Sequence, residues 1–310
     1  MKIWRTACGA AVVLMAVSAM PAHAAGDVLK ICLEEDLPPL SVHHRGAPGS
    51  GFDVALAQAI ATRLDRPLAI QWFGSKLDED SSPALEINAL LSDGRCSLVG
   101  GYALTTDGLV APGVKTAKLP DYEGATGPDH RRRVTLGVLT PSQPYLFSPL
   151  TIVLGPKARD RHIGGVGDLA GLRIGIESGT LADTILMNSD HGRLIDDITH
   201  LVPGRADLLG AMEHGEFDAT LLDLRRFDAY RAAHPDTKLS GSGYFYPIGV
   251  NRGYVGLASD GALLAAVNKA LSDLQAAGTL ASLGQAAGLT YLPPREPAIL
   301  GDIWLKVLQK

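Results

Sequence analysis

Motifs that mark metal-dependent or nucleophilic enzymes are missing from this sequence. It contains no H-E-x-x-H zinc pattern, no Walker phosphate loop, no G-x-G-x-x-G dinucleotide fingerprint and no G-x-S-x-G nucleophile elbow. Nine histidines are scattered along the chain, and the adjacent pair His43-His44 fits a surface turn better than a metal site. We therefore expect no cofactor, and the sequence favours a protein that is not an enzyme.

The sequence also has fewer basic residues than acidic ones. The chain has 28 Lys and Arg residues against 33 Asp and Glu residues. The first 24 residues hold two of the basic residues and none of the acidic ones, so the remainder carries a net charge of −7. An acidic chain is a poor partner for nucleic acid, which we therefore exclude.

Long apolar runs are confined to the N-terminus. Lys2 and Arg5 precede an apolar run over residues 10–19, and Ala22-His23-Ala24 has the form of an A-x-A cleavage site. This order is typical of a secretory signal peptide and is too short for a stable membrane span. We predict that residues 1–24 are removed and that a monomer without a membrane span reaches the periplasm.

Cysteine is scarce, with three residues in the whole chain, and Cys8 lies in the predicted signal peptide. Cys32 and Cys96 remain, and an even number in an oxidising compartment favours a disulfide. Such a bond would close a loop of over 60 residues and contribute roughly 4 kcal/mol to stability. Two separately buried thiols are the alternative.

The first strong pattern is a β-loop-α unit. Residues 29–33 alternate like a strand and end in the acidic loop Glu34-Glu35-Asp36-Leu37-Pro38-Pro39, where two prolines stop regular pairing. Apolar residues then recur at helical spacing between residues 52 and 64. Because ligands of open α/β sheets sit beyond the carboxyl ends of strands, this loop is the first candidate site.

The pattern continues as βαβαβ, with strands at 66–73 and 96–101 around a helix at 84–91, which predicts a parallel sheet. From residue 102 to residue 133 the periodicity vanishes, and we expect a structureless segment that is functional or mobile. Its basic cluster Arg131-Arg132-Arg133 has two interpretations. It is either a solvated loop or the docking edge for an acidic partner protein.

A second β-α series follows. We expect strands at 134–139, 151–154, 172–176, 217–222 and 244–250, and helices at 181–188, 206–214, 260–277 and 279–285. Ser178 and Thr180 lie in the turn before the helix at 181–188, where they either contact a polar ligand or cap the helix. Asp223 follows a buried strand and is well placed to meet a ligand.

Two such series, joined near Pro144 and near Pro247, predict two lobes with two chain crossings and a ligand cleft between them. The predicted boundaries are residues 27–146 plus 249–292 for one lobe, 147–248 for the other, and 293–310 for an irregular tail.

Several stretches, taken in order, resemble the family 3 extracellular solute-binding proteins, which serve polar amino acid transporters. The matching stretches are Leu29 to Pro39, Gly51 to Ala57, Ala89 to Gly94, Ser142 to Tyr145, Asp168 to Thr180, Gly215 to Ala219, Leu263 to Leu271 and Gly278 to Leu280. The resemblance implies a two-lobed α/β protein of the type II periplasmic binding fold, each lobe a mainly parallel sheet flanked by helices. It also implies a receptor that holds a small polar ligand for an ABC permease.

Two departures from the family bear on the ligand. Amino-acid binders of this family clamp the ligand carboxylate with an arginine after the third strand, where this chain has Leu104-Thr105-Thr106-Asp107-Gly108-Leu109. Leu40 replaces a usual aromatic residue, whereas Thr180 and Asp223 match the family's ligand-contacting threonine and ammonium-binding aspartate. The missing arginine favours a cationic or neutral polar solute over an ordinary α-amino acid. The predicted ligand-binding residues are Glu34, Asp36, Leu40, Tyr102, Thr105, Ser178, Thr180 and Asp223.

The cysteines resemble a subgroup, the quinoprotein-dehydrogenase-associated binding proteins known as J proteins of methanol-oxidation clusters. This resemblance implies that Cys32 and Cys96 are joined, and that the protein is an accessory of a periplasmic PQQ-dependent alcohol dehydrogenase. The cleft would then be modified or empty, with Arg131, Arg132 and Arg133 as partner contacts. Some proteins of the fold are dehydratases, which makes a dehydratase a minor alternative. A weaker hypothesis places calcium or a lanthanide at the acidic loop and Asp223.

Overall fold

The computed structural model describes residues 27–75, 82–110 and 113–301. The predicted signal peptide and the last part of the predicted tail lie outside these residues. Among the helices in the described part of the chain, none combines the length and the apolar character that a membrane span requires.

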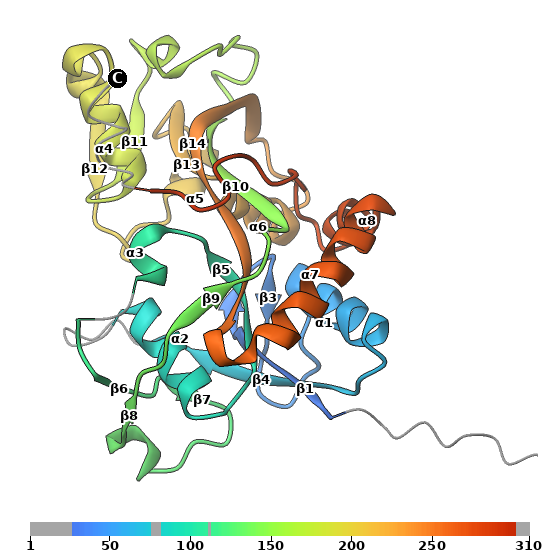
Figure 1. Cartoon of the computed structure of the whole chain (residues 1–310). Coiled ribbons are helices and arrows are strands. Elements are labelled where there is room, and N and C mark those ends of the chain that lie inside the picture. The colour runs from blue at the N-terminus through green and yellow to red at the C-terminus, as the bar shows by residue number, and fades with distance from the viewer. Residues whose placement is uncertain (1–26, 76–81, 111–112, 302–310) are drawn as a thin grey trace, which may run out of the picture.

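One mixed sheet runs through the molecule (Figure 1). Its strands lie in the order β12-β11-β13-β10-β14-β5-β1-β4-β7, and β9 pairs with β14 beside this path. The strands of the sheet are β1 (Leu29–Glu34), β4 (Leu68–Gly74), β5 (Leu98–Ala103), β7 (Asp121–Tyr122), β9 (Leu139–Pro141), β10 (Leu146–Leu154), β11 (Ile174–Glu177), β12 (Ile198–Leu201), β13 (Ala219–Asp223) and β14 (Ser240–Leu257). Two small sheets pair β2 (Asp36–Leu37) with β3 (Ser41–Val42) and β6 (Thr116–Lys118) with β8 (Arg133–Thr135).

The sheet has two groups of parallel strands with an antiparallel pair between them. β1 pairs in parallel with β4 and β5, and β11 pairs in parallel with β12 and β13. Between these groups, β10 and β14 pair from Leu146↔Arg252 to Leu154↔Ser240. We call the part built on β1, β4 and β5 the first half, and the part built on β11, β12 and β13 the second half. In Figure 1, β14 extends from one half into the other.

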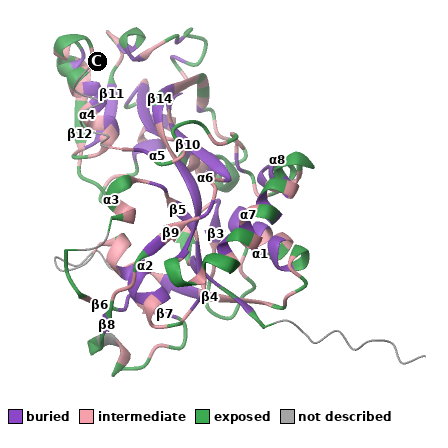
Figure 2. Ribbon diagram, in the orientation of Figure 1, coloured by how far each residue is buried: buried purple, intermediate pink, exposed green. Residues whose placement is uncertain are grey.

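Helices of the first half cover its sheet as the apolar spacing predicts. Phe52, Leu56 and Ile60 of α1 (Phe52–Arg63) are fully buried, and α1 packs against α7 (Gly261–Ala276) and α8 (Thr279–Ala286). α2 (Pro83–Ser92) begins with a proline at its first turn, where no amide partner is needed. Figure 2 shows the buried residues of both halves gathered along the central strands.

The disulfide prediction is confirmed. Cys32 in β1 is bonded to Cys96, which lies two residues before β5, with their Cα atoms 5.6 Å apart. β1 and β5 are neighbours in the sheet, with Cys32 opposite Val99. Both cysteines are buried in the same apolar cluster, so the bond ties two adjacent core strands together.

The second half differs from the sequence prediction at several elements. The strand β12 was not predicted, and β10 begins five residues before the predicted strand at 151–154. Its helices are α4 (Leu181–Asn188), α5 (Leu208–Glu213) and α6 (Leu224–Ala233), and α6 was not predicted. The reason is its composition, because α6 buries Asp228 beside Leu224 and Phe227 and so lacks a continuous apolar stripe. β14 is also much longer than the predicted strand at 244–250.

The expectation of a structureless segment at 102–133 is wrong. This stretch contains the short helix α3 (Thr106–Leu109), the β6 strand of a two-stranded sheet, and β7, which pairs with β4 at the edge of the main sheet. Ala117, Leu119 and Tyr122 are buried in the same cluster as the disulfide. Elements of two to four residues are too short to produce a periodic signal, which explains the error. Short 3-10 turns complete the described chain: η1 (Asp129–Arg131), η2 (Val166–Leu169), η3 (Ser189–Gly192), η4 (Ile195–Asp197) and η5 (Ala258–Asp260).

Candidate functional site

A cavity with mainly apolar walls lies at the carboxyl ends of β1 and β5, which is where the α/β rule predicts a ligand. Its volume is about 430 Å³. Leu37, Phe73 and Ile87 are among its apolar walls. The polar side chains that line it are Glu34, Ser82, Tyr102, Thr105, Asp107 and Arg252. Such a mixture of apolar surface and a few polar groups is typical of small-molecule sites.

Arg252 is the buried cation of this cavity and comes from β14. It is 8% exposed, and its Nε donates to Ser148 Oγ at 3.0 Å while Nη1 donates to the Gly101 carbonyl at 2.7 Å. Its Nη2 lies 3.9 Å from Asp223 Oδ2, which is beyond hydrogen-bond distance. A guanidinium has about five N–H donors, so in the described structure most of those on its two terminal nitrogens remain available to an acceptor. The arginine that the family has after the third strand is absent here, but an arginine from another strand, β14, lines this cavity.

Arg225 brings a second guanidinium close to the same cavity from the start of α6. Its Nη1 donates to the Pro38 carbonyl at 2.9 Å, which links the second half to the acidic loop of the first. Its buried Nε has no hydrogen-bond partner in the described structure. Burial lowers the pKa of Arg225, and the nearby Asp223 partly opposes this effect.

Glu34 ends β1 and faces this positive charge. Burial raises the pKa of the Glu34 carboxyl group, although Arg225 and Arg252 act in the opposite direction. Glu34 and Arg252 therefore line the cavity with charges of both signs, and Arg225 lies near enough to influence Glu34.

A smaller cavity of about 130 Å³ lies in the second half and contains Thr180 and Asp223. Thr180 caps α4 by accepting from the Asp183 amide at 3.1 Å, and Asp223 caps α6 by accepting from the Arg225 amide at 2.8 Å. Between the two interpretations of Thr180, the capping role is thus observed. Glu177 in the same cavity accepts two hydrogen bonds from Arg226, at 2.5 and 3.0 Å, and this pairing raises the Arg226 pKa.

The structure brings the predicted ligand-binding residues together only in part. Glu34, Tyr102 and Thr105 line the larger cavity, and Thr180 and Asp223 line the smaller one. The other three lie elsewhere: Asp36 is exposed in β2, Ser178 is half-buried in the turn after β11, and Leu40 is fully buried in the core. Because its side chain has no accessible surface, Leu40 offers no ligand contact in this conformation.

A buried carboxyl group supports the floor of the larger cavity. The Tyr145 hydroxyl donates to Asp53 Oδ1 at 2.8 Å and accepts from the Gly101 amide at 2.6 Å, while Asp53 Oδ2 has no partner in the described structure. Burial raises the pKa of Asp53 to about 7. Gly101 has a φ of +69°, and a Cβ there would lie 2.8 Å from Asp53 Oδ2, so this position requires glycine. Asp53 is thereby coupled to Gly101, whose carbonyl accepts from Arg252.

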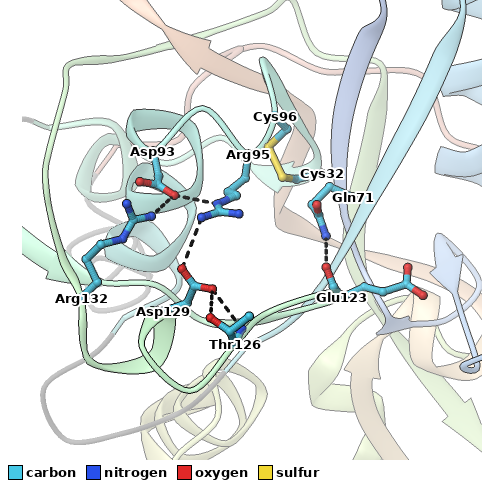
Figure 3. Close-up of polar contacts among 9 residues, drawn as sticks. All are labelled: Cys32, Gln71, Asp93, Arg95, Cys96, Glu123, Thr126, Asp129 and Arg132. Atoms are coloured by element: carbon cyan, nitrogen blue, oxygen red, sulfur yellow. Dashed lines mark hydrogen bonds and ion pairs between the residues drawn. A yellow bond between two sulfur atoms is a disulfide. The ribbon is translucent and has the colours of Figure 1, made fainter.

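The basic cluster at residues 131–133 is largely engaged within the molecule. Arg132 pairs with Asp93, and Arg133 donates to the Thr116 carbonyl at 2.9 Å. Figure 3 shows Asp93 between Arg132 and Arg95, with Arg95 reaching Asp129. The Thr126 hydroxyl and amide lower the pKa of Asp129 to about 2. These contacts thus hold the segment of the cluster against the end of α2. Because Arg132 and Arg133 are engaged in this way, they are less available to dock a partner protein.

His43 does not occupy the surface turn expected from the sequence. Its side chain is 9% exposed and its ring stacks on Trp72, with the ring centroids 4.6 Å apart. It borders a separate hollow of about 310 Å³ with Glu35, Arg45 and Glu123. Across residues 27–75, 82–110 and 113–301, no three His, Cys, Asp or Glu side chains are grouped to hold a metal ion. The calcium or lanthanide hypothesis therefore gains no support from the described chain.

Scans against protein-family models and curated proteins found no match. Solved structures do match. The L-cystine solute receptor of Neisseria gonorrhoeae, unliganded and open, is 19% identical with a TM-score of 0.59, over 84% of this chain and 92% of the receptor. The second substrate-binding domain of Lactococcus lactis GlnP, also open, is 19% identical with a TM-score of 0.59, over 83% of this chain and 93% of that one.

An enzyme shares the same architecture. An ancestral cyclohexadienyl dehydratase is 17% identical with a TM-score of 0.52, over 84% of this chain and 92% of the dehydratase. At these identities the matches establish the fold and nothing finer. The chain has the type II periplasmic binding fold, as the sequence predicted.

Proposed function

We propose that this protein is a periplasmic solute-binding protein that holds a small polar ligand between two lobes and presents it to an ABC permease. The lobes would be the predicted residues 27–146 plus 249–292 and residues 147–248, which correspond to the first and second halves. The guanidinium of Arg252 in the larger cavity carries this proposal, because its Nε and Nη1 donate within the protein whereas its Nη2 makes no hydrogen bond in the described structure and lies 3.9 Å from Asp223 Oδ2. A buried cation with free donors is costly unless an acceptor binds it, so the cavity is suited to a polar ligand.

The charges around the cavity also restrict the class of ligand. Arg252 offers donors to an acidic group, and Glu34 offers an acceptor to a basic or hydroxyl group. A solute that carries both kinds of group can bind both side chains, whereas a purely cationic solute is repelled by Arg252 and by the nearby Arg225. The sequence favoured a cationic or neutral solute. We propose a zwitterionic or acidic solute instead.

Replacement of Arg252 by lysine is expected to weaken ligand binding about 10- to 100-fold, because a charged hydrogen bond contributes about 1.5–3 kcal/mol. The measurement is isothermal calorimetry with L-cystine, L-glutamine, L-glutamate, L-arginine and spermidine as probes. Arg66→Lys is the matched control, because the Arg66 side chain contacts backbone carbonyls of Asp27 and Val28 instead of the cavity.

Two results would contradict the proposal. Binding of spermidine alone would remove the ligand preference, since spermidine has no acidic group for Arg252. Equal affinity in the wild type and Arg252→Lys would show that the ligand lies elsewhere.

The accessory function in alcohol oxidation is kept as a second candidate because Cys32 and Cys96 are bonded, as the subgroup resemblance implies. The engaged arginines at 132 and 133 do not favour it. A pull-down of a purified quinoprotein alcohol dehydrogenase by this protein, without binding of any probe solute, would reverse the order of the two candidates.

A further inference from the structure

The segment that follows α8 has no regular secondary structure, yet it is held at several points along its length. The Phe147 amide of β10 donates to the Leu292 carbonyl at 3.0 Å, and the Arg295 guanidinium lies 4.6 Å from the ring centre of Phe147. In Figure 1 this dark red segment leaves α8 and passes β10 and β14. Residues 293–301 of the predicted irregular tail are therefore attached to the central strands of the sheet.

Asn251 of β14 is the first major anchor of this segment. It is 3% exposed, and its amide nitrogen lies within hydrogen-bond distance of three carbonyl oxygens: Arg295 at 2.6 Å, Pro297 at 3.1 Å and Ala298 at 3.1 Å. Its Oδ1 accepts from the Arg295 amide at 3.0 Å. Both ends of one buried side-chain amide thus fix the path of the segment across the strand that joins the two halves.

Leu300 is the second anchor, and its backbone binds the first half. Its amide donates to the Leu104 carbonyl at 2.9 Å, and its carbonyl accepts from the Thr106 amide at 3.0 Å. The Thr106 hydroxyl lies 3.3 Å from the same carbonyl. These bonds hold the turn that begins α3, where Thr105 and Gly108 line the larger cavity.

The side chain of Leu300 belongs to the other half. It is 7% exposed and lies in the apolar cluster that contains Ile152, Ile176 and Ile248, at the core of the second half. The adjacent Ile299 is 39% exposed, so the two neighbouring residues have opposite environments. One residue therefore connects the cavity turn of the first half to the core of the second.

We propose that residues 293–301 form a strap that joins the two halves in addition to β10 and β14 and positions the Thr105–Gly108 turn of the cavity. The strap limits how far the halves separate, because separation must either extract Leu300 from its apolar cluster or break its hydrogen bonds to Leu104 and Thr106. Its action depends on these contacts and not on the identity of a ligand. It can therefore be tested without one.

The test compares Leu300→Asp with Ile299→Asp, which places the same charge at a buried and an exposed neighbour. Spin labels on cysteines at the exposed Gln58 of α1 and Asn188 of α4 report the separation of the halves. Hydrogen exchange reports the Thr106 amide. We expect Leu300→Asp to broaden the distance distribution toward longer values and to accelerate exchange of the Thr106 amide at least tenfold, while Ile299→Asp leaves both unchanged.

Two further variants keep the test decisive. Asn251→Asp is nearly isosteric but sets a carboxylate against three carbonyl oxygens, so it loosens the strap without altering Leu300. Leu300→Met keeps the apolar contact and is expected to restore wild-type distances and exchange. Unchanged distances in folded Leu300→Asp and Asn251→Asp would overturn the proposal, as would an equal effect of Ile299→Asp.

Discussion

Replacement of Cys32 and Cys96 together by alanine is expected to lower the free energy of unfolding by about 4 kcal/mol, because the bond closes a loop across 64 positions of sequence. The disulfide restricts the conformations of the unfolded chain, and the alanine variant lacks this restriction, so its unfolded state has a higher entropy. Both side chains are buried, so the loss of two sulfur atoms from the core adds to the effect. Urea unfolding followed by circular dichroism measures the difference.

A reducing agent supplies the control for this experiment. Reduction should destabilise the wild type to nearly the level of the alanine variant and should leave the variant itself unchanged. If the double alanine variant is as stable as the oxidised wild type, the prediction is refuted. Such a result would mean that the unfolded chain is already as compact without the disulfide as with it.

The second large effect concerns pH and Asp53. Its pKa is about 7 in the folded protein against an ordinary value of 3.8, because burial disfavours the charged carboxylate. Between about pH 4 and pH 7 the folded chain therefore keeps a proton that the unfolded chain has released. Stability falls as the pH rises through this window, by about 1.4 kcal/mol per pH unit and by up to about 4 kcal/mol in total.

Asp53→Asn should remove this slope, because the amide does not ionise and its oxygen still accepts from the Tyr145 hydroxyl. The difference in unfolding free energy between variant and wild type is expected to shift in favour of the variant from pH 4 to pH 8. Asp196→Asn, at an exposed position, is the matched control. Parallel stability profiles for wild type and Asp53→Asn would show that Asp53 titrates normally.

Elements with a continuous apolar stripe were predictable from the sequence. The bounds of α1, α4 and α7 differ from the predicted helices by at most one residue at either end. The short strands β6 and β7 were not predictable in this way. β6 packs against α2 and β7 pairs with β4, and these partners are distant in sequence.

The candidate site was harder to predict than the fold for the same physical reason. Glu34 and Thr105 follow strands and could be placed by rule, but Arg252 reaches the cavity through the register of two strand pairs. It lies opposite Ala103 of β5 and Leu146 of β10, and these partners come from separate parts of the chain. In the sequence, Arg252 stands out as the single charged residue of the mainly apolar stretch Gly249-Val250-Asn251-Arg252-Gly253-Tyr254-Val255. Burial of a charge is unfavourable unless the charge is paired or binds a ligand, so this arginine was the local indication of a site.

The position of β14 in the sheet also sets the order in which the protein can be completed during synthesis. β5 is made early, but one of its edges pairs with β14, whose residues 240–257 emerge only in the last quarter of the chain. Until then the nascent first half presents an open strand edge and an uncovered core face, because α7 and α8 come later still. The first half is therefore expected to stay incomplete, with this strand edge and core face exposed, until the chain up to residue 286, where α8 ends, is available for folding.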